Sequence, residues 1–178
     1  MAARYGWNPN LEKDLPSGSH CPFVSGRRAH TLVEYAAEVL LVDDNPADID
    51  LVRDGLRKRS SAFRVSAVSD GEEAISFLRK RGRFADAPEP DIIVLDLNLP
   101  RKDGREVLAE VKTDAMLARI PVVIFTTSAA CADVNFSYQH GANCYLQKPG
   151  NFPDYMSVVK SLAGFWLDLA LLPNKEME

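Results

Sequence analysis

Residues 92–100 read IIVLDLNLP, four large apolar residues followed by an aspartate and a short segment that ends in proline. A brief run of Ile, Val and Leu is typical of a strand that is covered on both faces of a parallel sheet. Similar runs, VLLV at 39–42 and VVIF at 122–125, occur before and after it. With two less uniform segments, the pattern predicts five strands, at 38–42, 63–68, 92–95, 122–125 and 144–146.

Amphipathic stretches separate these strands and are predicted to form helices. Their predicted ranges are 47–59, 72–81, 105–113, 130–140 and 152–171. Asp70 is a suitable N-cap for the second helix, because acidic residues follow it in the first turn. Strands that alternate with helices predict an α/β fold: a doubly wound, five-stranded parallel sheet with helices on both faces and the flavodoxin-like strand order 2-1-3-4-5.

The composition excludes several classes of protein. The chain has 178 residues, 46% of them hydrophobic, and a formal net charge of -4, so it offers no basic surface for nucleic acid. No segment is long and apolar enough to predict a membrane span. Its three cysteines, Cys21, Cys131 and Cys144, lie far apart in the sequence. This odd number and wide spacing favour a protein of the reducing cytoplasm over a disulfide-linked or metal-binding one.

Residues 1–33 differ in character from the rest of the chain. Several Pro, Gly, Ser and Asn residues interrupt them, and no periodic pattern is sustained. They are either a genuine partner-binding tail or an incorrectly assigned start. We favour the second interpretation, because Val33 could be an alternative initiation codon. The predicted domain therefore occupies 34–172, and a short tail follows at 173–178.

Polar residues follow four of the predicted strands. Asp43 and Asp44 come directly after the first strand, and Asp96 comes after the third. Thr126 follows the fourth strand, and Lys148 lies just beyond the fifth. In a doubly wound sheet the carboxyl ends of the strands meet at one edge, where ligands bind. Three close carboxylates require a cation, and their oxygens suit Mg²⁺. A nearby lysine and hydroxyl complete a site for Mg²⁺-assisted phosphoryl transfer onto an aspartate.

Each of these residues also has a purely structural interpretation. Asp43 and Asp44 could belong to the cap of a helix that begins at Pro46. Asp96 could be a turn residue, and Lys148 could be an ordinary surface lysine. Taken singly, these interpretations are the simpler ones. The coincidence of such residues at four strand ends favours the phosphoryl site.

At these positions the chain resembles the receiver domains of two-component signalling. The matching stretches are LVDDN at 41–45, DLNLP at 96–100, DG at 103–104, Thr126, and GANCYLQKP at 141–149. The resemblance covers about residues 36–171. It implies that Asp96 accepts a phosphoryl group from a histidine kinase. It also implies a signalling protein rather than an enzyme, one that catalyses only its own phosphorylation and dephosphorylation.

The resemblance implies a role for the residues around Asp96 as well. Four groups would bind Mg²⁺: Asp43, Asp44, Asp96 and the backbone carbonyl of Asn98. Lys148 would pair with the phosphoryl group, and Thr126 would move to donate a hydrogen bond to it. Tyr145 would turn inward when Thr126 moves. The Lys148–Pro149 peptide bond would be cis, as is usual in such domains.

A narrower resemblance is to the small receivers that partner bacterial phytochromes. It is carried by DNPAD at 44–48, DLNLPRKDG at 96–104, TTS at 126–128 and FW at 165–166. It implies a phytochrome-type histidine kinase as the partner. Two features depart from the family. Thr127 replaces the alanine or glycine that often follows the switch threonine, and could restrict access to Asp96. The family also normally begins just before the first strand, without an extension.

The segment 152–171 carries more apolar residues than one core-facing stripe requires. Phe165, Trp166 and Leu167 are consecutive, so they cannot all face one core. Because exposed aromatic residues commonly mark interfaces, we hypothesise a homodimer with Phe165 and Trp166 as interface candidates. In the alternative, Trp166 folds under the tail. No DNA-binding module follows the fifth strand, so we expect output through protein–protein contacts.

The sequence fits three other functions less well than it fits a receiver. A phosphatase of the haloacid-dehalogenase type needs a second catalytic aspartate two residues after the nucleophile, where this chain has Asn98. A flavin-binding protein needs a phosphate-cradling loop after the first strand, where Asp43 and Asp44 would repel the phosphate. An adaptor with a vestigial site would have lost site residues, yet all of those expected are present.

Overall fold

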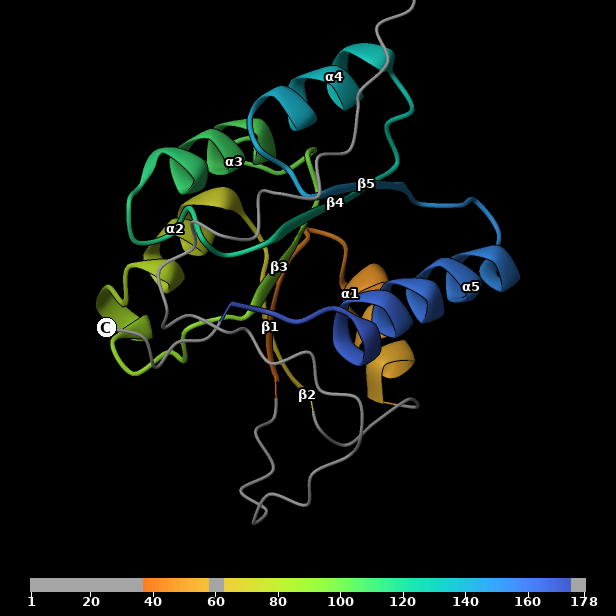
Figure 1. The fold of residues 1–178 in the computed structure, drawn as a ribbon, viewed down its shortest axis with the longest axis horizontal. Helices are drawn as coiled ribbons and strands as arrows, with labels where there is room; N and C mark the ends of the chain where they lie inside the picture. Colours follow the sequence, from red (N-terminus) through yellow and green to blue (C-terminus); the bar gives the residue numbers. More distant parts are fainter. Residues whose placement is uncertain (1–36, 58–62, 174–178) are drawn as a thin grey trace, which may run out of the picture. The chain divides into compact units, whose positions relative to one another are not determined.

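Five strands form one parallel sheet in the order β2-β1-β3-β4-β5 (Figure 1). Their bounds are β1 Ala37–Val42, β2 Phe63–Val68, β3 Ile92–Leu95, β4 Val122–Thr126 and β5 Cys144–Gln147. Each predicted strand agrees with an observed strand to within one residue at either end. The predicted α/β fold and its strand order are therefore confirmed.

The computed structural model of the chain describes residues 37–57 and 63–173, all within one compact unit, Glu34–Glu178. The interpretations of residues 1–33, and of the tail beyond residue 173, lie outside the described residues and stay predictions. Among the described residues, no helix combines the length and the apolar character that a membrane span requires.

Helices cover both faces of the sheet. Their bounds are α1 Pro46–Arg57, α2 Gly71–Leu78, α3 Gly104–Thr113, α4 Cys131–Gln139 and α5 Phe152–Ala163. Helices α1 and α5 lie on one side of the sheet, and α2, α3 and α4 lie on the other (Figure 1). The second helix is shorter than the predicted 72–81, and a 3₁₀ turn, η2 Gly82–Phe84, follows it.

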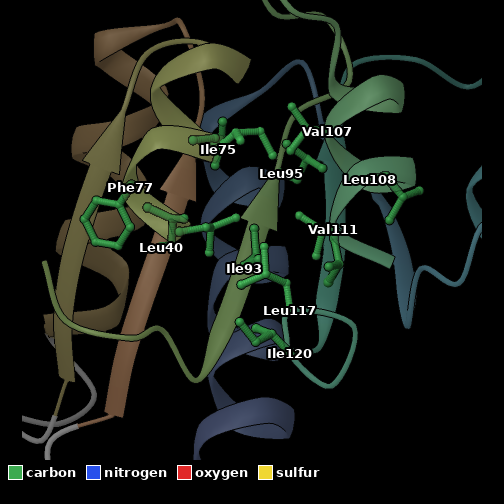
Figure 2. Close-up of a cluster of buried hydrophobic side chains, with 14 of the residues drawn as sticks. Leu40, Ile75, Phe77, Ile93, Leu95, Val107, Leu108, Val111, Leu117 and Ile120 are labelled. Atoms are coloured by element: carbon green, nitrogen blue, oxygen red, sulfur yellow. The ribbon is translucent and has the colours of Figure 1, made fainter. Parts of the chain in front are cut away.

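Two apolar cores lie on opposite faces of the sheet. Leu40 and Ile93 are paired across β1 and β3 and point into the core under α2 and α3, which Figure 2 shows. The next pair, Leu41 and Val94, points into the core under α1 and α5. All four are at most 1% exposed. This alternation explains the uninterrupted apolar runs, because both faces of a central strand are buried.

Side-chain caps fix the beginnings of α2 and α3. The Asp70 carboxylate accepts a hydrogen bond from the Glu73 N–H at 2.9 Å, so the predicted N-cap is confirmed. Asp103 and Glu106 form a capping box at the start of α3. Such caps satisfy N–H groups that have no partner within the helix. They therefore hold the loops after β2 and β3 against the ends of α2 and α3.

Helices α1 and α5 touch each other closely at Gly55. A Cβ atom at this position would lie 2.5 Å from Val159 Cγ1 on α5. A side chain of any size would therefore push the two helices apart, and glycine permits their contact.

Helix α4 is held to the core by few apolar contacts. Ser137 is its only buried residue, and Phe136 is partly buried against the core under α2 and α3. The His140 ring stacks on Phe136, with 3.8 Å between the ring centroids. The position of α4 therefore depends strongly on polar contacts at its amino end.

The last helix differs from the prediction of regular helix over 152–171. Helix α5 ends at Ala163 and continues as a π-helical segment, η3 Gly164–Leu169. The wider turn is closed by the Ala170 N–H, which donates to the Phe165 carbonyl. Three consecutive apolar residues cannot share one α-helical face. In η3, Trp166 and Leu167 pack on the core under α1 and α5, and Phe165 stays 55% exposed.

Candidate functional site

Three aspartates predicted from the strand ends meet at the carboxyl edge of the sheet. Asp43 follows β1, Asp96 follows β3, and both are buried, whereas Asp44 is exposed. One carboxylate oxygen of each lies within 4.8 Å of the others. The loop backbone turns back on two of these groups: the Asn45 N–H donates to Asp43, and the Asn98 N–H donates to Asp96.

Lys148 extends from the end of β5 into this group of carboxylates. Its Nζ lies 2.6 Å from Asp43 Oδ2 and 2.7 Å from Asp96 Oδ2. Only 3% of the lysine side chain is exposed. The alternative interpretation of Lys148 as a surface lysine is therefore excluded. The Lys148–Pro149 bond is trans, not cis as the resemblance implied. The difference in free energy between the two forms before proline is small, and the trans chain brings the ammonium to its carboxylates.

Asp48 is a site residue that the sequence analysis missed. Its Oδ2 lies 2.9 Å from Lys148 Nζ, and its side chain is 16% exposed. It lies in the first turn of α1, not at the end of a strand. An acidic residue in a first helical turn is usually explained by the helix dipole. The sequence feature that could have indicated Asp48 is its position two residues after Pro46, because the first turn of this helix lies near the strand ends.

Burial and ion pairing act in opposite directions on these groups. Burial alone would lower the pKa of Lys148, but hydrogen bonds to Asp43, Asp96 and Asp48 raise it well above its ordinary value. Lys148 therefore stays an ammonium ion. Burial raises the pKa of Asp43, although its bond to Lys148 works against this rise. One ammonium faces several carboxylates, so the site retains negative charge for a cation.

Thr126 ends β4 and is fully buried beside the site. Its hydroxyl oxygen is 3.5 Å from Asn98 Nδ2 and 3.4 Å from the N–H of Ser128, both long distances for hydrogen bonds. Tyr145, on β5, packs partly against the core, and its hydroxyl donates to the Ser128 carbonyl at 3.0 Å. Ser128 therefore contacts both residues that the resemblance names as switch residues.

An ion pair and a hydrogen bond join helices α3 and α4 to the loop that carries Ser128. Arg105 lies 2.7 Å from Asp133, and the Ser128 hydroxyl donates to the same carboxylate. These two hydrogen bonds lower the pKa of Asp133, while partial burial opposes them. Because α4 has little apolar anchoring, this polar contact is a large part of what holds its amino end.

Gly104 lets the start of α3 pack directly against the backbone of Asp96. A Cβ at this position would lie 2.1 Å from the Asp96 carbonyl oxygen. The Gly104 N–H donates to the Leu97 carbonyl at 2.9 Å, which closes the loop. The DG pair at 103–104 thus holds the segment that carries Asp96.

Phe165 and Trp166 lie outside this site. They help to line an apolar groove of about 300 Å³ between β5 and the last helix, together with Cys144, Leu146 and residues of α5. The two rings contact each other edge to face, with 5.2 Å between their centroids. The structure thus separates the predicted interface candidates from the predicted phosphoryl site.

The donor set at the strand ends fits a hard divalent cation. Asp43, Asp44 and Asp96 supply carboxylate oxygens, the ligands that Mg²⁺ and Mn²⁺ accept. The same edge holds a buried ammonium, a buried hydroxyl and the buried Asp96. Chemically, such an arrangement can stabilise the charge of a phosphoryl group beside a carboxylate nucleophile.

Comparison with known families agrees with this geometry. The family model of the response regulator receiver domain matches residues 39–160. The chain belongs to the response regulator receiver family. It is therefore a signalling protein of the receiver type, and the predicted recognition is confirmed.

Relatives of this receiver include proteins of known structure. The chain is 44% identical to the response regulator Rcp1 of Synechocystis over 135 residues, which are 76% of this chain and 92% of Rcp1. The crystal structure of Mn²⁺-bound Rcp1 superposes with a TM-score of 0.75, covering 78% of this chain and 99% of that one.

Two further similar structures are of response regulators named after phytochromes. One is the phosphorylated cyanobacterial phytochrome response regulator RcpA, 46% identical with a TM-score of 0.75, covering 78% of this chain and 99% of RcpA. The other is the bacteriophytochrome response regulator AtBRR, 38% identical with a TM-score of 0.60, covering 78% of this chain and 98% of AtBRR.

Proposed function

We propose that this receiver accepts a phosphoryl group on Asp96 from a histidine kinase. The observation that carries the proposal is the Lys148 ammonium, buried 2.7 Å from Asp96 and flanked by further carboxylates. In the transfer, an Asp96 carboxylate oxygen attacks phosphorus, an O–P bond forms and the N–P bond of the phosphohistidine breaks. The electron pair of that bond returns to the imidazole nitrogen, which takes up a proton.

Other residues of the site take supporting roles in this proposal. Lys148 pairs with the new phosphoryl oxygens, and Thr126 turns its hydroxyl toward them. Tyr145, already bonded to Ser128, then responds to the displaced loop. The added charge would bias these groups between two arrangements. The receiver would then signal through protein–protein contacts, and it would catalyse only its own phosphorylation and dephosphorylation.

Mg²⁺ is the cofactor that we propose for the acidic cluster. Asp43, Asp44, Asp96 and the Asn98 backbone carbonyl would hold it. When bound, the cation offsets the charge of the phosphoryl oxygens and of the carboxylates. The cluster of carboxylate oxygens in this chain and the Mn²⁺-bound form of Rcp1 support this assignment.

Phosphorylation can be tested by mass spectrometry of the intact protein. Incubation with acetyl phosphate and Mg²⁺ should add one phosphoryl mass to the wild type, and EDTA should prevent the addition. Asp96→Asn should remain unmodified. Asp86→Asn, which changes an exposed loop aspartate, should be modified as the wild type is. A full adduct on Asp96→Asn would refute the assignment of the acceptor.

A phytochrome-type histidine kinase is the proposed phosphate donor. The support is the similarity to RcpA and AtBRR, whose names connect them with phytochromes. Purified phytochrome kinases, labelled on histidine, should transfer phosphate to this chain faster than unrelated kinases do. Equal rates from kinases of both groups would contradict the assignment.

A homodimer is proposed through the groove beside β5 and the last helix. β5 is an edge strand of the described sheet, and the exposed ring of Phe165 lies beside the apolar groove. Sedimentation should give a mass that rises with protein concentration, and Phe165→Ser should reduce this rise. A monomer mass at every concentration would exclude the dimer.

We further propose that residues 34–172 constitute the receiver domain and that it acts in the cytoplasm. The free thiols Cys131 and Cys144 fit a reducing compartment. Mass analysis of the native protein would test the proposed start, since a chain beginning at Ala2 would exclude initiation at Val33.

A further inference from the structure

Lys148 donates to three aspartates at once. The distances from its Nζ are 2.6 Å to Asp43, 2.9 Å to Asp48 and 2.7 Å to Asp96. An ammonium group has three N–H bonds, so each carboxylate can accept one of them. Three acceptors in different directions fix the position of the nitrogen more firmly than one ion pair could.

Asp48 differs from the other two acceptors. Asp43 and Asp96 belong to the carboxylates whose oxygens converge within 4.8 Å, and Asp48 does not. It approaches Lys148 from the first turn of α1, whereas the other two lie at strand ends. A cation at the strand ends would attract Asp43 and Asp96 but would leave Asp48 with Lys148.

The surroundings of Asp48 keep its contact with Lys148 sheltered from water. Lys148 Nζ lies 5.8 Å from the centre of the Phe125 ring, and Tyr155 packs against that ring at 5.3 Å. The Tyr155 hydroxyl is buried and has no hydrogen-bond partner among the described residues. Burial first, and then the charge of Asp48, raise the pKa of this hydroxyl. A charged hydrogen bond is stronger in such surroundings than in water.

We propose that Asp48 is a positioning residue for phosphoryl transfer. It keeps the Lys148 ammonium at the site while Asp43 and Asp96 exchange part of their contact with Lys148 for a cation and a phosphoryl group. Lys148 then meets the incoming phosphoryl oxygens without first having to be ordered. This role rests on the proposed function, because it concerns the same transfer to Asp96.

The test compares two aspartates of α1 that differ in their contacts. Asp48→Asn removes the charge beside Lys148. Asp50→Asn removes the same charge from a side chain that is 76% exposed and pairs only weakly with Arg53, at 3.5 Å. The rate of phosphoryl incorporation from acetyl phosphate is measured at saturating Mg²⁺ for both. We expect about a tenfold fall in Asp48→Asn, the size of one charged hydrogen bond, and no change in Asp50→Asn.

A second measurement follows Lys148 directly. The ¹⁵N–¹H signal of its ammonium group, assigned by its loss in Lys148→Arg, should persist in the wild type with Mg²⁺ and beryllofluoride. It should broaden or vanish in Asp48→Asn and persist in Asp50→Asn. A fold disturbed in general would instead lower the melting temperature and shift signals throughout the spectrum.

The outcomes separate this inference from the proposed function. If the wild type takes up no phosphoryl group, the proposed function fails. If the wild type is phosphorylated and Asp48→Asn reacts as fast as Asp50→Asn, or faster, Asp48 does not position Lys148. An unchanged Lys148 signal in Asp48→Asn would overturn the inference as well.

Discussion

Replacement of Lys148 by methionine should destabilise the fold strongly at neutral pH. Methionine keeps the length of the side chain and removes its charge, so packing over Phe125 changes little. The variant leaves Asp43 and Asp96, 1% and 6% exposed, without the ammonium that each contacts within 2.7 Å. Breaking a buried ion pair from one side costs about 3–5 kcal/mol, because the remaining charge stays buried and unpaired. We expect a loss of that size in the free energy of unfolding.

The loss should depend on pH in a defined direction. Without Lys148, the folded-state pKa of Asp43 rises further above its unfolded value, because burial already raises it and the bond to Lys148 no longer opposes the rise. A carboxyl group with a raised folded-state pKa destabilises the fold above its unfolded pKa, near 3.9, and little below it. In the wild type, the raised pKa of Lys148 keeps the ammonium charged at acidic and neutral pH, so its ion pairs weaken only as the carboxylates take up protons at low pH. The two proteins should therefore differ most at pH 7.5 and converge near pH 4.

Urea unfolding at pH 7.5 and pH 4, with and without Mg²⁺, measures these differences. Mg²⁺ should restore more stability to Lys148→Met than it adds to the wild type, since it would replace the missing positive charge. Lys160→Met, an exposed substitution on α5, should lie within about 0.5 kcal/mol of the wild type. A loss below about 1 kcal/mol at pH 7.5, or an equal loss at both pH values, would refute the reasoning.

Further predictions concern Gly104 and the polar anchor of α4. Gly104→Ala should lose at least about 3 kcal/mol in urea unfolding, because its Cβ would meet the Asp96 carbonyl, whereas Gly150→Ala, with nothing within 4 Å, should be near neutral. A similar loss in both would show that the close contact is not the cause. Arg105→Ala should lower hydrogen-exchange protection in α4 more than in α3, and unchanged protection in α4 would contradict its anchoring by Asp133. Because the pKa of Asp133 is lowered, its contribution is present above the unfolded pKa near 3.9 and lost as pH falls through the folded value. Asp133→Asn should therefore remove the acid sensitivity of the α4 amide signals, and a variant that keeps it would exclude this carboxylate as the cause.

The strands and their order could be predicted because their residues obey simple periodic rules. The apolar runs of β1, β3 and β4 are long enough to exclude an exposed face, and their ends fall where polar residues begin. The same rule brought Asp43 and Asp96 to one edge of the sheet. The end of a strand can be predicted from the point where an apolar run stops. Site residues at strand ends can therefore be predicted without a structure.

Residues on helices were harder to assign. Asp48 lies in the first turn of α1, and which way a helical side chain faces depends on how the helix is rotated by its packing, here against α5. The π-helical segment η3 could not be predicted either. The sequence shows that three adjacent apolar residues cannot share one helical face, but it does not show how the backbone adjusts to them. The proposed roles of Thr126 and Tyr145 depend on a movement between two arrangements. Sequence patterns indicate only one folded arrangement, so they do not predict such a movement.

The contact between α1 and α5 at Gly55 bears on how a partner could influence phosphorylation. A partner bound in the groove beside α5 would press on a helix that has almost no free space against α1. Helix α1 carries Asp48, and so a small displacement could reach Lys148. Thermodynamic linkage makes any such influence mutual. If binding in the groove raises the affinity of the site for a phosphoryl group, phosphorylation must raise the affinity of the groove for its partner by the same factor.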